Sequence, residues 1–157
     1  MAIQIKSRNS TTFYKKKEFH DTNITLHTRN KSFWYPTYNQ NGYPHVQQAF
    51  LLPPERQQEF DPFILLAEDW FKRGVFGDHP HRGFQTVTYV VDGRLEHIDN
   101  AGGYSILDAG DIQYMNAGWA ARHAEEAYED DLIHTLQLWL NLPKALKNTE
   151  QAIKIFV

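Results

Sequence analysis

Residues 78–93 read DHPHRGFQTVTYVVDG, and this stretch decides the fold class of the chain. It begins with two histidines that flank a proline, continues into a run rich in β-branched residues over 85–91, and ends at Asp92-Gly93. Aspartate followed by glycine is typical of a hairpin turn, because glycine accepts a positive φ without steric cost. The order of these features predicts an extended segment, a long strand and a tight turn, and therefore antiparallel β-structure.

Short runs of β-branched and aromatic residues, separated by Gly, Pro, Asn and Asp, occur on both sides of this stretch, and aromatic residues make up 14% of the 157-residue chain. A chain of this length is most simply one domain. Many short strands at such spacing predict an all-β sandwich or barrel. Only residues 143–152, which begin with proline, are expected to form a short helix. We expect strands over 24–28, 46–51, 63–67, 85–91, 95–98, 104–107, 112–115 and 135–140.

The composition excludes several classes of function. The chain has no cysteine, so neither a disulfide framework nor thiolate ligation of a metal is available. Its net charge of −3 argues against direct nucleic-acid binding, and the one basic run, 15–17, is short. The N-terminal residues lack the apolar stretch of a signal peptide, and no segment is long and apolar enough to span a membrane. We therefore expect a cytoplasmic protein without a nucleic-acid or membrane partner.

Two pairs of potential metal ligands have the spacing of strand residues that share one face. His79 and His81 are separated by Pro80, whose fixed φ favours extended backbone before it. His123 and Glu125 have the same spacing and follow a glycine, at the start of another expected strand. If both pairs face one interior, three imidazoles and one carboxylate surround a point, a set that suits iron, manganese, nickel, copper or zinc. Spacing alone leaves open a second interpretation, two unrelated surface pairs.

The other histidines are expected to have no metal-binding role. His20, His27, His45 and His134 are interpreted as exposed, non-functional residues. For His97, a hydrogen-bonded structural role is expected, with metal ligation as the alternative. Nucleophilic catalysis is a poor competitor, since the chain has no cysteine and no G-x-S-x-G motif.

Several segments, in the same order, resemble the N-terminal cupin domain of the pirin family. The resemblance implies a single cupin-type β-barrel, also described as a double-stranded β-helix or jelly roll. It further implies an N-terminal arm with edge strands over 1–45, the barrel over 46–143, and a C-terminal segment over 144–157 with a short helix, while the second cupin domain of pirins is absent. The matching segments are DPFILL (61–66), DHPHRGFQTVTYVVDG (78–93), LEHIDNAGG (95–103), AGDIQYMNAG (109–118), HAE (123–125) and LQLWLNLP (136–143).

The resemblance also implies the metal site. In pirins, an HxH and a later HxE supply four ligands to iron, which here correspond to His79, His81, His123 and Glu125. Ordinary cupins instead have a metal-binding glutamate at the position of Thr86. Fe²⁺ is the expected metal, and nickel, zinc, copper or manganese are expected as substitutes in recombinant protein.

Two further positions depart from the usual pirin sequence. Gln85 replaces a glutamate, which is expected to remove a charge close to the site. Trp119-Ala120 replaces an arginine-glycine pair, which is expected to make the mouth of the site narrower or more apolar.

The resemblance suggests a quercetin 2,3-dioxygenase-type enzyme, which opens a flavonol ring with O₂. Glu125 is then expected to act both as a ligand and as the catalytic base that removes the flavonol 3-hydroxyl proton. A planar substrate could face Phe84, Tyr89, Tyr114 and Trp119, although each of them could instead pack in the core. The alternative is a non-enzymatic, iron-dependent partner and redox sensor of a transcription regulator.

The C-terminal run Ala152–Val157 is too apolar for a free tail. We expect it to pair with another strand or to dock on another surface. A homodimer is the expected way to cover apolar surface that a second pirin domain would otherwise cover.

Overall fold

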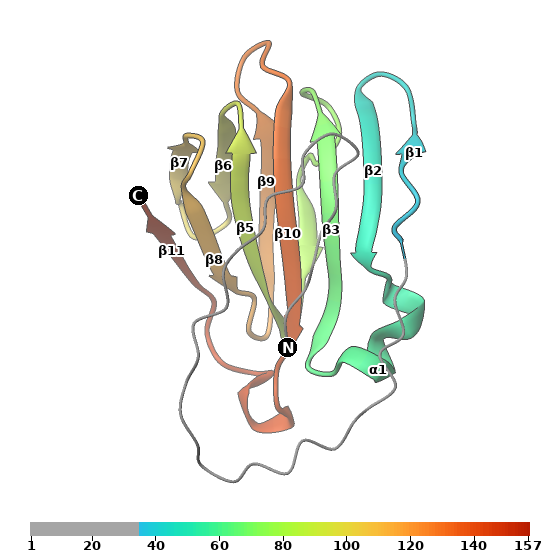
Figure 1. The fold of residues 1–157 in the computed structure, drawn as a ribbon. Coiled ribbons are helices and arrows are strands. Elements are labelled where there is room, and N and C mark those ends of the chain that lie inside the picture. The colour runs from blue at the N-terminus through green and yellow to red at the C-terminus, as the bar shows by residue number, and fades with distance from the viewer. Residues whose placement is uncertain (1–34) are drawn as a thin grey trace, which may run out of the picture. The chain divides into compact units, whose positions relative to one another are not determined.

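The computed structural model describes residues 35–157, which are mainly antiparallel strands (Figure 1). The expected strand over 24–28 and the residues His20 and His27 lie outside this part. Helical structure in it is limited to single turns: η1 (Pro54–Arg56), α1 (Gln57–Phe60) and η2 (Lys144–Leu146). The strands are β1 (Asn39–Gln40), β2 (His45–Leu52), β3 (Phe63–Phe71), β4 (His79–His81), β5 (Phe84–Asp92), β6 (Leu95–Asp99), β7 (Tyr104–Leu107), β8 (Ile112–Asn116), β9 (Ala121–Ala127), β10 (Ile133–Asn141) and β11 (Ala152–Phe156).

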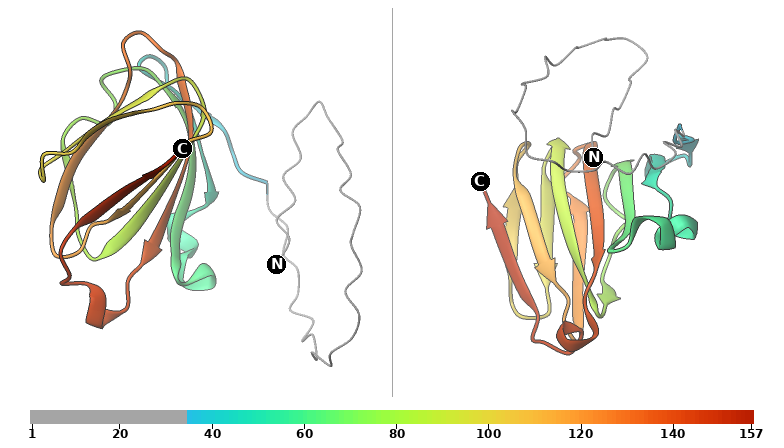
Figure 2. Two further views of the ribbon diagram at one scale, coloured as in Figure 1. Left: turned by 90° about the vertical axis from the view of Figure 1, so that its left-hand side faces the viewer. Right: turned by 60° about the horizontal axis from the view of Figure 1, so that its bottom comes forward.

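The strands form two antiparallel sheets that face each other and enclose an interior (Figure 2). The larger sheet has seven strands in the order β1-β2-β3-β10-β5-β8-β11, and the smaller has four in the order β4-β9-β6-β7. Consecutive strands often belong to different sheets, so the chain crosses repeatedly between them. This architecture confirms the expected single all-β barrel.

Every second side chain of the long strands points into the barrel, as the period of a strand requires. One part of the interior is apolar and includes Phe71, Leu95 and Ile133, all nearly inaccessible to solvent. Strand β3 continues to Phe71, beyond the expected end at residue 67. The extension carries two acidic residues, Glu68 and Asp69, and both have hydrogen-bonding partners in neighbouring strands. Charged residues therefore do not mark the end of this strand, although the expected boundary lay just before them.

Two glycines allow close approaches between segments. Gly93, in the predicted turn between β5 and β6, has φ +78°, and a Cβ atom there would lie 2.9 Å from the carbonyl oxygen of Leu132. Gly118, between β8 and β9, has φ +53°, and its Cβ would lie 2.0 Å from the carbonyl oxygen of Thr149. A side chain at Gly118 would therefore push the C-terminal segment away from the turn that leads to β9.

The C-terminal segment differs from the expectation in one detail. The helix expected over 143–152 is limited to η2, and the chain then extends into β11, which pairs with β8. Ile153 and Ile155 alternate with exposed neighbours and pack against the core, so burial of one face favours a strand. The expectation that Ala152–Val157 pairs is thus confirmed within the chain itself. A homodimer remains a prediction.

Candidate metal site

The two predicted ligand pairs lie on adjacent strands of the smaller sheet. Strand β4 consists of His79, Pro80 and His81, and it pairs with β9 so that His79 is opposite His123. His81 and His123 are buried, and His79 is partly exposed. The antiparallel register therefore brings together histidines that are far apart in the sequence.

The three imidazole rings form a nearly equilateral triangle. The centroid distances are 4.7 Å between His79 and His81, 4.6 Å between His79 and His123, and 4.7 Å between His81 and His123. The Nδ1 atom of His79 donates to the carbonyl oxygen of Gly77 over 2.7 Å, which leaves a lone pair on Nε2. The Nε2 atom of His123 lies 3.1 Å from that atom. Two ring nitrogens that approach so closely are well placed to share one cation.

The protonation state of these rings is also the one that metal binding requires. Burial, and then the neighbouring histidines, lower the pKa of both His81 and His123 to about 3. Both are therefore neutral at pH 7, the form that ligates metals. Within the described part of the chain, both ring nitrogens of His81 and the Nδ1 of His123 are buried without a hydrogen-bonding partner. Buried polar atoms without partners are costly, and a bound cation would satisfy lone pairs of this kind.

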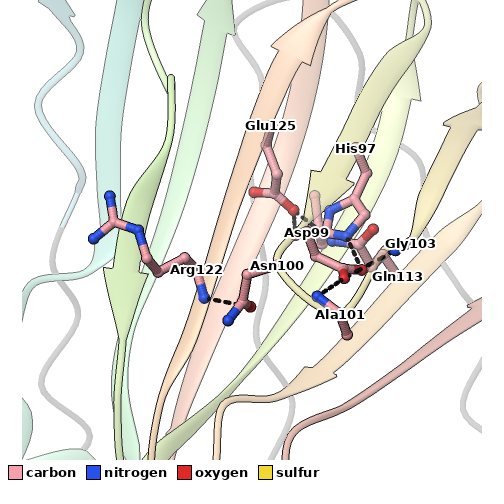
Figure 3. Close-up of polar contacts among 9 residues, drawn as sticks. His97, Asp99, Asn100, Ala101, Gly103, Gln113, Arg122 and Glu125 are labelled. Carbon is pink, nitrogen blue, oxygen red and sulfur yellow. Dashed lines mark hydrogen bonds and ion pairs between the residues drawn. The ribbon is translucent and has the colours of Figure 1, made fainter.

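Glu125 lies two residues after His123 on β9 and is almost completely buried. Its Oε1 accepts hydrogen bonds from Gln113 Nε2 at 2.7 Å and Thr88 Oγ1 at 3.1 Å (Figure 3 shows the Gln113 contact). Its Oε2 accepts one from Gln137 Nε2 at 2.6 Å. Three neutral donors thus compensate a buried carboxylate that would otherwise be strongly unfavourable.

The four predicted ligands do not form a single group. His79, His81 and His123 have ligand atoms within 4.8 Å of one another, and so do His97, His123 and Glu125. The two groups share His123. The structure therefore brings the three predicted histidines together and groups Glu125 with His123 and His97.

His97 is the residue that sequence reasoning undervalued. It is almost completely buried, its Nε2 lies 3.1 Å from Asp99 Oδ2, and its Nδ1 has no partner among the described residues. Asp99 is held in turn by the backbone N–H groups of Ala101 and Gly103 (Figure 3). The expected structural hydrogen bond is confirmed, but the ring also borders the candidate site. Its position in β6, two residues from the buried Leu95, was a signal for this orientation.

The expectation of exposed histidines was wrong for His45 and His134. Both are partly buried. His45 Nε2 lies 2.7 Å from Asp69, and His134 Nε2 lies 2.9 Å from Glu68. These carboxylates belong to the unexpected extension of β3, so the strand boundary and the histidine environments were misjudged together.

Glu125 also lines a small cavity. It has a volume of about 10 Å³, and its polar lining consists of Asp69, Thr88, Glu125, Thr135 and Gln137. This is roughly the space for one water molecule and too small for a substrate. Burial raises the pKa of Asp69, and the hydrogen bond with His45 opposes this effect. The polar interior is therefore closely packed beside Glu125.

The four aromatic residues that were expected to face a substrate lie in different environments. Phe84 contacts His81, with ring centroids 5.1 Å apart. Trp139, which was not predicted, also contacts His81, at 5.3 Å, and packs on Phe84 at 4.6 Å. Tyr89 and Tyr114 lie at the positions of β5 and β8 that alternate with the buried ones, and Trp119 is exposed. Phe84 and Trp139 are therefore the aromatic pair beside the candidate site.

An antiparallel barrel with a histidine cluster on its inner face defines the protein as a cupin with a candidate metal site. The family model described as Pirin matches residues 40–140, well over half of the chain. The chain therefore belongs to the pirin family.

Relatives and solved structures support this assignment. A pirin-like protein of Caulobacter vibrioides is 45% identical over 110 residues, which cover 65% of this chain and 39% of that protein. Pirin-1 of Arabidopsis thaliana is 44% identical over 99 residues, covering 62% of this chain and 34% of that protein. The chain thus spans less than half the length of these relatives.

Two solved structures share the fold. A crystal structure of a Geobacillus kaustophilus protein has a TM-score of 0.74 and 45% identity, covering 77% of this chain and 48% of that one. A quercetin 2,3-dioxygenase from Acinetobacter baumannii has a TM-score of 0.63 and 29% identity, with the same coverage of 77% and 48%. Among the described residues, no helix has the length and apolar character needed to cross a membrane.

Proposed function

We propose that this chain binds one divalent transition metal through His79, His81, His123 and Glu125, and acts as a quercetin 2,3-dioxygenase-type enzyme. The observation that carries the metal proposal is the triangle of imidazoles, in which His81 and His123 have buried ring nitrogens without a partner among residues 35–157. The reaction proposal is supported by the fold shared with a protein named quercetin 2,3-dioxygenase at 29% identity.

The donor set limits the choice of metal. Imidazole and carboxylate without thiolate suit iron, nickel, copper, manganese or zinc, and iron is our proposal for the native ion. When bound, such an ion would supply Lewis acidity toward a substrate oxyanion and a template for the two reactants.

The two oxygens of Glu125 differ in the number of hydrogen bonds that they accept. A carboxylate oxygen has two lone pairs, and Oε1 already accepts two hydrogen bonds, from Gln113 and Thr88. Oε2 accepts one, from Gln137, and so retains one free lone pair. Oε2 is therefore the atom that can ligate a metal or accept the flavonol 3-hydroxyl proton. For one oxygen to do both, Gln137 would have to withdraw.

Phe84 and Trp139 would help to position the substrate. Their rings lie 4.6 Å apart and both contact His81. A flat flavonol could pack against such an aromatic wall, which would keep water from the reacting carbon atoms.

Anaerobic iron loading followed by oxygen-uptake measurements with a panel of flavonols tests the proposal. Replacing Glu125→Gln should lower turnover by about 10²–10⁴-fold, the usual cost of losing a general base. Metal content, measured by elemental analysis, should fall much less. Glu126→Gln is the matched control, because this residue follows on the same strand, is less buried and keeps an acceptor for Gly74 N–H.

The outcomes separate the roles. Equal loss of metal and turnover in Glu125→Gln would reduce this residue to a ligand, and unchanged turnover would remove it from the mechanism. Wild-type protein that binds iron but consumes no oxygen with any flavonol would contradict the dioxygenase proposal and leave metal binding standing.

A further inference from the structure

The arginines of the described part differ in their partners. Among the residues that the structure describes, no carboxylate lies within ion-pair distance of Arg82, which is exposed directly after the candidate ligand His81. The other arginines of residues 35–157 are each paired with an acidic side chain: Arg56 with Glu59, Arg73 with Glu96, Arg94 with Asp131, and Arg122 with Asp78.

Arg82 borders a hollow that we call the Arg82 pocket. Its lining residues are Arg82, Gly83, Lys144, Lys147 and Asn148, and its volume is about 330 Å³. The three charged residues of the lining are all basic, and no acidic residue contributes to it. Lys144 belongs to η2, and β5 begins just after Gly83, so the pocket lies between η2 and the start of β5. Figure 1 shows the backbone of both elements.

Lys147 is fixed in this pocket by its own contacts. Its Nζ donates to the carbonyl oxygen of Gly83 at 2.8 Å and to Asn141 Oδ1 at 2.6 Å. An ammonium group has three N–H donors, so one remains for a ligand. The aliphatic part of the same side chain covers Gly83, where an added Cβ would lie 3.5 Å from it. A flexible cation is thus held in place before any ligand arrives, which reduces the entropy cost of binding.

We propose that the Arg82 pocket binds the oxyanion group, carboxylate or phosphate, of a small molecule. Arg82, Lys144 and the free N–H of Lys147 supply charged donors, and the amide of Asn148 can supply a neutral one. Guanidinium and ammonium groups recognise oxyanions through charge-assisted hydrogen bonds. Three like charges around one hollow repel each other, and an anion relieves that repulsion.

Size and charge favour a small ligand over a polyanion. The volume lies near the lower end of small-molecule sites, which span about 300–1,000 Å³. The whole chain carries a net charge of −3, which opposes a long nucleic-acid or sulfated polysaccharide chain. The inference is independent of the proposed metal and reaction, since none of the pocket residues is a candidate metal ligand.

Titration of ¹⁵N-labelled, metal-free protein with inorganic phosphate and with malonate tests the pocket. Sodium chloride keeps the ionic strength constant. We expect saturable shifts at Arg82, Gly83 and residues 144–148. Arg82→Gln should weaken binding by about tenfold, because one charge-assisted hydrogen bond is lost. Lys154→Gln is the matched control, since it removes the same charge from an exposed position of β11 outside the pocket lining.

Lys144→Gln provides a second variant should Arg82→Gln unfold, and the amide spectrum of each variant checks the fold. Saturation with either anion, weakened by Arg82→Gln or Lys144→Gln and not by Lys154→Gln, supports the proposal, and the tighter anion identifies the preferred oxyanion. Linear shifts spread over all lysines, or equal weakening by Lys154→Gln, would overturn it. So would a short oligonucleotide that binds more tightly than both anions, because the occupant would then be a polyanion.

Discussion

Two layers of side chains inside the barrel come from the same strands and differ in character. In β3, β5, β6, β9 and β10, an apolar inward residue is followed or preceded, two positions along, by a polar one. The apolar layer consists of the buried residues of one cluster: Phe71, Val90, Leu95, Leu107, Ala127 and Ile133. The polar layer consists of the buried polar residues of the interior: Asp69, His81, Thr86, Thr88, His97, Gln113, His123, Glu125 and Thr135.

The comparison shows that the two layers contribute with opposite sign to the stability of the folded state. Burying apolar surface stabilises the folded state by roughly 25 cal/mol per Å². A buried polar atom without a partner instead costs about 1–3 kcal/mol. Within residues 35–157, such atoms include nitrogens of His81, His97 and His123, the Thr86 hydroxyl and the Gln113 carbonyl oxygen. The polar layer therefore destabilises the metal-free barrel, and we attribute its presence to ligand binding.

The largest expected effect comes from removing the histidine that both ligand groups share. His123→Ala should abolish stoichiometric metal binding, with an affinity loss of more than about 100-fold, since changes outside the ligand shell already cost about 10–100-fold. Elemental analysis after dialysis against nickel or zinc measures this. His134→Ala is the control, because this histidine contacts Glu68 and Trp70 instead. Full metal content in His123→Ala would refute the site.

The apolar layer should respond in the opposite way. Leu95→Ala removes a completely buried side chain and should lower the free energy of unfolding by about 2–5 kcal/mol. Metal stoichiometry should remain unchanged under conditions where the variant is folded. Urea unfolding followed by circular dichroism gives the first quantity and elemental analysis the second. Loss of metal from folded Leu95→Ala would show that the two layers are not separable.

Acid should weaken the metal-free protein through the polar layer. His81 and His123 have a pKa near 3 in the folded state, below the ordinary value of 6.5 that applies after unfolding. The unfolded chain therefore binds more protons between these values, and stability that is complete above about pH 6.5 is lost as the pH falls toward 3. Urea midpoints between pH 7 and pH 4 test this. A double variant, His81→Gln with His123→Gln, should show a flatter profile, and an identical slope would contradict the assignment.

The smallest effect is expected at a position that the sequence suggested to be important. Gln85 was expected to lie close to the site, but its amide donates to the Tyr114 hydroxyl, and it alternates along β5 with the inward Thr86 and Phe84. Gln85→Glu should therefore change metal affinity by less than about threefold, since solvent screens a charge outside the barrel. Isothermal titration with nickel measures the difference. A tenfold change in affinity would contradict this, because it would mean that a charge at position 85 acts on the metal site.

Local sequence patterns predicted the all-β fold. The spacing of His79 and His81 around Pro80 also predicted, without knowledge of the remaining chain, that both residues belong to one extended segment. The partners of Glu125 could not be found in this way, because Thr88, Gln113 and Gln137 come from three other strands. Their polar side chains at inward positions of otherwise apolar strands were a visible signal. What they contact depends on strand register, which local patterns do not determine.

The C-terminal segment shows a second limit. The apolar character of Ala152–Val157 predicted a segment that pairs or docks, but not its partner. Pairing with β8 depends on the close approach at Gly118, where the carbonyl oxygen of Thr149 accepts a hydrogen bond from Trp119 N–H at 2.9 Å. This contact joins residues that are distant in the sequence, and composition gives no indication of it.

The contact between Trp139 and His81 gives the barrel an optical reporter. The indole ring centroid lies 5.3 Å from that of a candidate ligand, and its N–H is fixed by Gln137. Ions with partly filled d shells quench nearby indole fluorescence, whereas zinc has a filled d shell. Nickel or copper should therefore dim the emission of this protein, while zinc should leave most of it. Replacing Trp139→Phe should remove most of that response, since Trp70 stacks on His134 instead and Trp119 is exposed.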